Sequence, residues 1–189
     1  MIRLVFALLM LPGAALACAC CAERGERYAY QVEMGGYERA ELARLRADGA
    51  AKLFVTACGL DCVTGLTDPQ LDYGVEISVD EGGVTFGFAD AQGRARGGLE
   101  MAWPEGYVLS GVDTDPLSDA PDAQLYTEMR LTGTARGTGD FASDGPLSAT
   151  LIYAGRGNMC LQAAGLTHWS IDVAGEGVNY RLFGGLTAR

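Results

Sequence analysis

The stretch LDYGVEISVDEGGVTFGFADAQGRARGGLEMAW, residues 71–103, alternates apolar and polar side chains over three successive segments. The alternating apolar residues are Val75, Ile77 and Val79, then Val84, Phe86 and Phe88, then Leu99, Met101 and Trp103. Glycines separate the segments, at positions 82–83 and 93. A period of two puts successive side chains on opposite faces of a β-strand, and the glycines favour tight turns. The stretch therefore predicts a meander of hairpins with one dry face and one wet face.

The same alternation continues toward the end of the chain, around residues 129–132, 151–153 and 169–173, and a final hairpin turns at residues 175–177. An antiparallel sheet of this size must protect its edges, either by closing on itself or by stacking in two layers. We therefore predict an all-β fold, an antiparallel meander of about eight or nine strands that forms a small barrel or a sandwich. Glycines inside the strand patterns favour the barrel, and a barrel of about eight strands can enclose one small ligand.

Helical spacing of apolar residues occurs in YERAELARLRAD, residues 37–48. Leu42 and Leu45 share one face of a helix there, Glu41 is placed to pair with Arg44, and a glycine follows as a stop signal. We expect one short N-terminal helix that lies on the core.

Residues 1–17 carry the pattern of a secretory signal peptide: one arginine, an apolar run over residues 4–11, and a small-residue site at residues 15–17. The apolar run is shorter than the roughly 20 residues that a membrane-spanning helix needs. We expect cleavage after Ala17 and a single β-rich domain over residues 18–189 that is periplasmic or secreted. The formal net charge of −10 repels nucleic acids and anionic lipid surfaces, so nucleic acid is not an expected partner.

The six cysteines are Cys18, Cys20, Cys21, Cys58, Cys62 and Cys160. An even number in an exported chain predicts disulfides. Cys58 and Cys62 are spaced for a local bridge, whereas Cys160 is the distant partner expected for Cys20 or Cys21. Because a bond between adjacent cysteines is strained, Cys20 and Cys21 are expected to have different partners.

The cysteine cluster at the mature N-terminus allows two other interpretations. Cys18 is a candidate for lipidation, and only in that case would the protein bind a membrane as a lipid-anchored protein of the cell envelope. Closely spaced thiolates also suit Cu(I) or Zn(II), and Cys18, Cys20 and Cys21 with Cys160 and His168 would supply such a metal site. Metal binding requires reduced thiols, which conflicts with an oxidising compartment. No other cofactor is expected.

A further candidate region is GRGNMCLQAAGLTHW, residues 155–169. The residues that would line a ligand site there are Arg156, Asn158 and Trp169. Cys160 and His168 would form a nucleophile and its base if the region were catalytic. The structural alternative is a loop held by a Cys160 disulfide, with Trp169 in the core. Aromatic residues elsewhere, such as Tyr28 and Tyr30, either line a pocket or pack in the core.

The sequence contains no phosphate-binding loop, no H-E-x-x-H zinc motif, no dinucleotide-binding fingerprint and no serine nucleophile elbow. The favoured function is therefore that of a non-enzymatic periplasmic or cell-envelope protein, held together by disulfides, that binds a small ligand or a protein partner of the envelope. The alternatives are copper or zinc binding through the N-terminal cysteines, and an enzyme that uses the Cys160/His168 loop.

Overall fold

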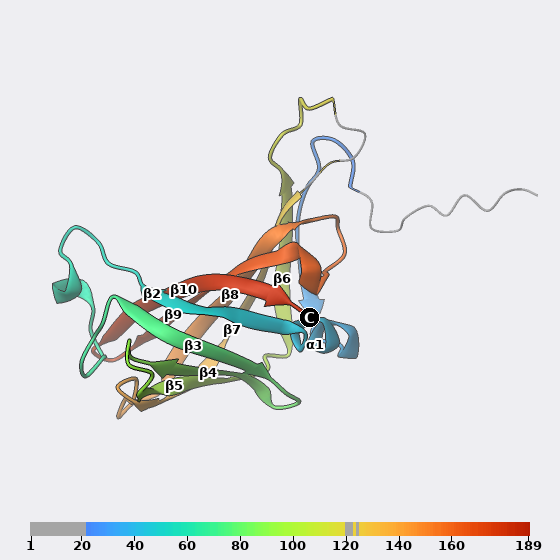
Figure 1. Ribbon diagram of the computed structural model, residues 1–189. Coiled ribbons are helices and arrows are strands. Elements are labelled where there is room, and N and C mark those ends of the chain that lie inside the picture. The colour runs from blue at the N-terminus through green and yellow to red at the C-terminus, as the bar shows by residue number, and fades with distance from the viewer. Residues whose placement is uncertain (1–21, 120–122, 124) are drawn as a thin grey trace, which may run out of the picture.

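A computed structural model describes residues 22–119, 123 and 125–189 of the chain (Figure 1). Its strands are β1 (Arg27–Glu33), β2 (Leu45–Leu53), β3 (Asp72–Val79), β4 (Gly83–Ala89), β5 (Ala95–Ala102), β6 (Gly106–Asp113), β7 (Leu125–Gly139), β8 (Leu147–Gly157), β9 (Leu166–Gly175) and β10 (Val178–Ala188). Helix α1 (Gly36–Leu42) joins β1 to β2, and short 3-10 turns occur at Leu60–Cys62 and Ala163–Gly165. No helix in the described ranges is long and apolar enough to span a membrane.

Eight of these strands close into an antiparallel barrel, in the order β7-β5-β4-β3-β2-β10-β9-β8 and back to β7. The predicted all-β fold is confirmed, and of its two forms the barrel is the one observed. The meander predicted from residues 71–103 forms β3, β4 and β5, with Ile77 opposite Phe86 in the β3–β4 ladder. The described chain has ten strands rather than eight or nine, because two more extend the barrel wall.

The two additional strands, β1 and β6, continue the sheet past one end of the barrel (Figure 1). The 15-residue β7 pairs with β5 through its C-terminal end, where Ala135 faces Met101, and with β6 through its N-terminal end, where Arg130 faces Val108. Strands β5 and β6 thus follow one another along the same side of β7. Strand β1 pairs with β6 and ends the sheet.

Aromatic side chains fill the interior of the barrel. The rings of Phe88 and Phe141 stack with centroids 4.5 Å apart, and Phe86 lies 5.0 Å from Trp169. All four side chains are buried, as are Tyr73, Tyr153 and Tyr180. An eight-stranded barrel is just wide enough for side chains to fill it, and burial of each large apolar side chain contributes roughly 1.5–3 kcal/mol. The interior is therefore the hydrophobic core, and a ligand site has to be sought on the outside.

The helix prediction is only half right. Helix α1 ends at Leu42, and Leu45 already begins β2, so the predicted extension to residue 48 is wrong. Leu42 and Leu45 are both fully buried, and Glu41 pairs with Arg44 at 2.9 Å as expected. The strand prevails because residues 45–53 gain backbone ladders with both β10 and β3, which a longer helix would forfeit. Gly49, expected to stop the helix, lies inside β2 with φ +96°.

Helix α1 is clamped against the loop that contains the Ala163–Gly165 turn. The Tyr37 hydroxyl donates a hydrogen bond to the Leu161 carbonyl at 2.8 Å, and the Ala163 N–H donates to the Glu41 carboxylate at 2.7 Å. This backbone hydrogen bond, together with Arg44, holds the pKa of Glu41 below its usual range. The clamp and the disulfide loop around residues 54–65 lie at opposite ends of the molecule (Figure 1).

Candidate functional site: a cleft roofed by a disulfide loop

The loop of residues 54–65 leaves the end of β2 and is fastened to β10 at two points. The Phe54 N–H donates to the Arg181 carbonyl at 2.9 Å, which extends the β2–β10 ladder by one bond. Farther along, Thr64 and Asn179 exchange two backbone hydrogen bonds of 3.2 and 3.0 Å. Because both ends of the loop lie along the same strand, the residues between them must project away from the barrel wall.

The projecting part of this loop is held in shape by a disulfide between Cys58 and Cys62, whose Cα atoms are 5.9 Å apart. The predicted local bridge is therefore confirmed. Backbone hydrogen bonds from Gly59 to the Thr56 carbonyl, 2.9 Å, and from Val63 to the Leu60 carbonyl, 3.0 Å, close two turns around it. Gly59 has φ +64°, a conformation that glycine adopts without strain. The disulfide and these two turns therefore fix the shape of the loop, which we call the roof.

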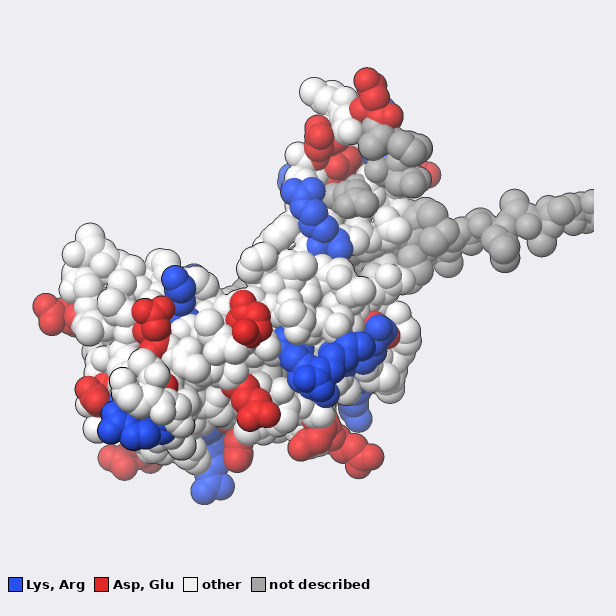
Figure 2. Space-filling model, in the orientation of Figure 1, with Lys and Arg blue, Asp and Glu red and all other residues white. Residues whose placement is uncertain are grey.

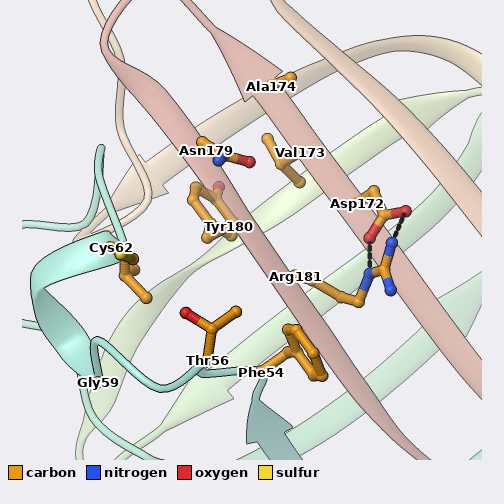
Figure 3. A pocket seen from close by; sticks show the side chains of 11 residues that line it. Phe54, Thr56, Gly59, Cys62, Asp172, Val173, Ala174, Asn179, Tyr180 and Arg181 are labelled. Atoms are coloured by element: carbon orange, nitrogen blue, oxygen red, sulfur yellow. Dashed lines mark hydrogen bonds and ion pairs between the residues drawn. The ribbon is translucent and has the colours of Figure 1, made fainter.

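A cleft of about 360 Å³ lies between this roof and the outer side of the β9–β10 hairpin (Figure 3). Its lining residues are Phe54, Thr56, Gly59, Cys62, Val63, Asp172, Val173, Ala174, Asn179, Tyr180 and Arg181. In the hairpin Asp172 is paired with Arg181 and Ala174 with Asn179, so these four side chains share the outer face. We call this site the roofed cleft.

One end of the roofed cleft is formed by an ion pair and an aromatic ring. Arg181 Nη2 lies 2.7 Å from Asp172 Oδ2, and Arg181 Nε also contacts Asp172 Oδ1. The guanidinium carbon is 5.6 Å from the centroid of the Phe54 ring, in cation–π range. The hydrogen bonds that Arg181 donates to Asp172 raise the pKa of Arg181, so the guanidinium stays charged. As these are the charged lining residues, the cleft has no net charge.

The rest of the roofed cleft combines apolar surface with uncharged polar groups. The Phe54 side chain is 47% exposed, an unusual amount for a phenylalanine, and presents an open aromatic face. Figure 3 shows Thr56, Asn179 and Tyr180 between this end of the cleft and Cys62 at the other. Tyr180 contributes no hydroxyl to the cleft, because its side chain points into the barrel, where its ring lies 6.0 Å from Phe141 and burial raises its pKa. The cleft offers one apolar wall together with hydroxyl and amide donors and acceptors.

The candidates in residues 155–169 lie elsewhere. Arg156, Asn158 and Cys160 line a small cavity of about 50 Å³. Trp169 is buried in the barrel core against Phe86, because its place in β9 points its side chain inward, and it does not face a ligand site. His168 is exposed on β9, with its Nδ1 2.8 Å from Thr167 Oγ1.

Cys160 is disulfide-bonded, and in that state it supplies neither a thiolate to a metal nor a nucleophile to a reaction. Cys18, Cys20 and Cys21 lie outside the described residues, as does the whole predicted signal peptide, residues 1–17. Within the described ranges, no three His, Cys, Asp or Glu side chains are grouped to hold a metal ion. The metal site and the lipid anchor involve the undescribed cysteines and stay predictions.

The sequence indicated the loop that covers the cleft, but it did not indicate the residues that form the walls of the cleft. The Cys58/Cys62 spacing marked the loop, whereas Phe54, Asp172, Asn179 and Arg181 carried no motif. Phe54 and Arg181 become neighbours only because β2 and β10 are adjacent in the closed barrel. One signal for these walls was available in the sequence. An Asp and an Arg lie on the two strands of the predicted final hairpin, and cross-strand pairs of opposite charge occur on exposed sheet faces.

No protein-family model, curated protein or solved structure matches this chain. The function of the protein is therefore inferred from the geometry of the roofed cleft.

Proposed function

We propose that the protein is a non-enzymatic binding protein that holds a small, neutral, hydroxyl-rich molecule, such as a mono- or disaccharide, in the roofed cleft. The observation that carries the proposal is the combination, in one cavity of about 360 Å³, of an exposed aromatic face and uncharged hydrogen-bonding groups. Sites for small molecules have volumes of roughly 300–1,000 Å³ and join apolar walls to a few polar groups.

The chemistry of the lining narrows the class of ligand. Arg181 is already bound by Asp172 and stacked near Phe54, so it is not a free cation that would attract an anion. A molecule with an apolar ring face can lie on Phe54 while its hydroxyls exchange hydrogen bonds with Thr56, Asn179 and the Asp172 carboxylate. Sugar rings have this combination of an apolar face and a hydroxyl rim, which is why we favour a saccharide.

We further propose that the protein acts outside the cytoplasm, in the periplasm or cell envelope. The Cys58–Cys62 disulfide supports this location, because disulfides persist in oxidising compartments. The predicted signal peptide supports it independently. In this setting a rigid, disulfide-closed roof would hold the cleft in its binding shape, so that little conformational entropy is lost when the ligand binds.

The test is isothermal titration calorimetry of the purified protein against a panel of neutral mono- and disaccharides, with Phe54→Ala as the variant and Phe183→Ala as the matched control. Phe183 is also on the outer surface and is 39% exposed, but it does not line the cleft. For the sugar that binds, we expect Phe54→Ala to weaken affinity about tenfold or more, and Phe183→Ala to leave it unchanged.

Two results would count against the proposal. One is the absence of binding across the whole panel. The other is an equal loss of affinity in Phe54→Ala and Phe183→Ala, which would place the site elsewhere.

A further inference from the structure

Strand β1 ends the sheet, and no strand in the described part of the chain pairs with its outer edge. The inner edge is fully used: the Met34 N–H donates to the Glu105 carbonyl at 3.0 Å, and the Asp113 N–H donates to the Glu26 carbonyl at 2.9 Å. These two bonds show which alternate residues of β1 form backbone hydrogen bonds with β6. The even-numbered residues of β1 point their backbone groups at β6, whereas Arg27, Ala29, Gln31 and Glu33 point theirs outward.

This edge lacks the devices that usually prevent strands from pairing between molecules. The strand RYAYQVE has seven residues and contains no proline, no lysine and no bulge in its register with β6. The side chains of its four outward-bonding residues are all exposed. Within the described residues neither Arg27 nor Glu33 forms an ion pair, although they carry opposite charges. Among the described residues, nothing occupies the outward backbone groups or the charges of this edge, which can therefore contact a partner.

The sequence of β1 is complementary to itself when it is read in the antiparallel direction. If Tyr30 faces Tyr30 of a second copy, Arg27 faces Glu33, Tyr28 faces Val32 and Ala29 faces Gln31. In this register the residues whose backbone groups point outward, such as Ala29 and Gln31, face one another in hydrogen-bonded pairs. The register is therefore compatible with the ladder that β1 already forms with β6. Each of the two ends of the ladder gains an Arg–Glu pair. A two-fold axis requires this kind of self-complementarity.

We propose that the outer edge of β1 binds a second copy of this chain, in an antiparallel ladder centred on Tyr30, so that two barrels share a continuous sheet. Tyr30 supports this register, because its side chain is 43% exposed and stacks on Tyr28 at 5.2 Å. At the axis it falls in a non-hydrogen-bonded pair, where facing side chains approach most closely. Tyrosine is also enriched at the centre of protein interfaces.

The first test compares the wild type with Ala29→Pro and Ala29→Thr by sedimentation equilibrium. Proline removes the outward N–H and places its ring toward the partner, yet it breaks no bond to β6 and is tolerated in edge strands. Threonine keeps the N–H. We expect dimers for the wild type and Ala29→Thr, and monomers with an unchanged circular dichroism spectrum for Ala29→Pro. A wild type that stays monomeric at about 100 µM, or a folded Ala29→Pro that dimerises equally well, overturns the proposal.

The second test exchanges the charges and does not depend on how proline is tolerated. Arg27→Glu places two like-charged pairs across the interface, and so does Glu33→Arg. We expect each single change to weaken the dimer about tenfold or more at low salt, and the double change to restore it to within about threefold. Single variants that dimerise like the wild type, or a double variant as weak as the singles, would exclude this register.

Discussion

One face of the β9–β10 hairpin contributes to the core of the barrel, and its other face forms a wall of the roofed cleft. The two faces differ in burial and in polarity. Val173 and Tyr180 point inward and are buried, whereas Asp172 and Arg181 point outward and form an ion pair at the surface. The interior is filled by stacked aromatic rings, whereas the loop of residues 54–65 covers part of the exterior. Buried side chains on the inner face therefore stabilise the barrel, whereas the polar side chains lie on the outer face.

The contrast shows why a barrel of this size need not carry a ligand in its middle. Phe86, Phe88, Phe141 and Trp169 occupy the space in which a ligand would lie. The cavity arises instead where β2 stops at Leu53 and the chain leaves the wall, only to return at Thr64. One added loop on a filled barrel is therefore enough to create a site without weakening the core.

The largest effect on stability is expected from Phe86→Ala. Phe86 is fully buried between Phe88 and Trp169, and its truncation should lower the free energy of unfolding by about 3–5 kcal/mol. Urea denaturation followed by tryptophan fluorescence measures the change. Phe54→Ala is the counterpart on the outside, where the loss should be below about 1 kcal/mol. Equal losses would mean that the aromatic interior is not the core of stability.

A smaller effect is expected from removing the roof's disulfide with Cys58→Ser/Cys62→Ser. The bridge closes a loop of sequence separation 4, for which the chain-entropy estimate gives about 2 kcal/mol. The barrel should stay folded, because none of its ladders includes the bridge, but ligand affinity should fall as the roof loosens. Thermal unfolding and titration of the same variant measure both quantities. Unchanged affinity would show that the roof does not shape the site.

The smallest effect is expected at the far end of the barrel, where Glu41 clamps α1. Its pKa is lowered in the folded state by the Ala163 N–H and Arg44, so its stabilising contribution is complete above its ordinary value of 4.5 and is lost as the pH falls below it. Glu41→Gln should cost about 1 kcal/mol at pH 7, and the difference from the wild type should shrink as the pH falls below 4.5.

Denaturation curves at several pH values measure the Glu41 effect, with Glu76→Gln as the control. Glu76 is exposed and forms no ion pair within the described chain, so its variant should follow the wild type throughout. A Glu41→Gln penalty that does not decrease at all as the pH falls below 4.5 would mean that the contribution of Glu41 does not come from its charge.

Much of the fold follows from local patterns, and the site does not. The alternation in residues 71–103 predicts β3, β4 and β5 because each strand's inward face is set by its own side chains. Leu45 shows the limit of such reasoning: its spacing from Leu42 suits a helix, but the ladder with β10 decides its conformation. The cleft depends entirely on such distant pairing, since Phe54 meets Arg181 only after the barrel has closed.

If recognition takes place in the roofed cleft and not in the barrel interior, ¹⁵N–¹H chemical-shift mapping during titration with the saccharide panel will locate it there. We expect shifts concentrated at Phe54, Thr56, Asn179 and Arg181, while Phe86 and Trp169 in the core stay unchanged. Shifts centred on the core residues, or no shifts with any member of the panel, would contradict this expectation.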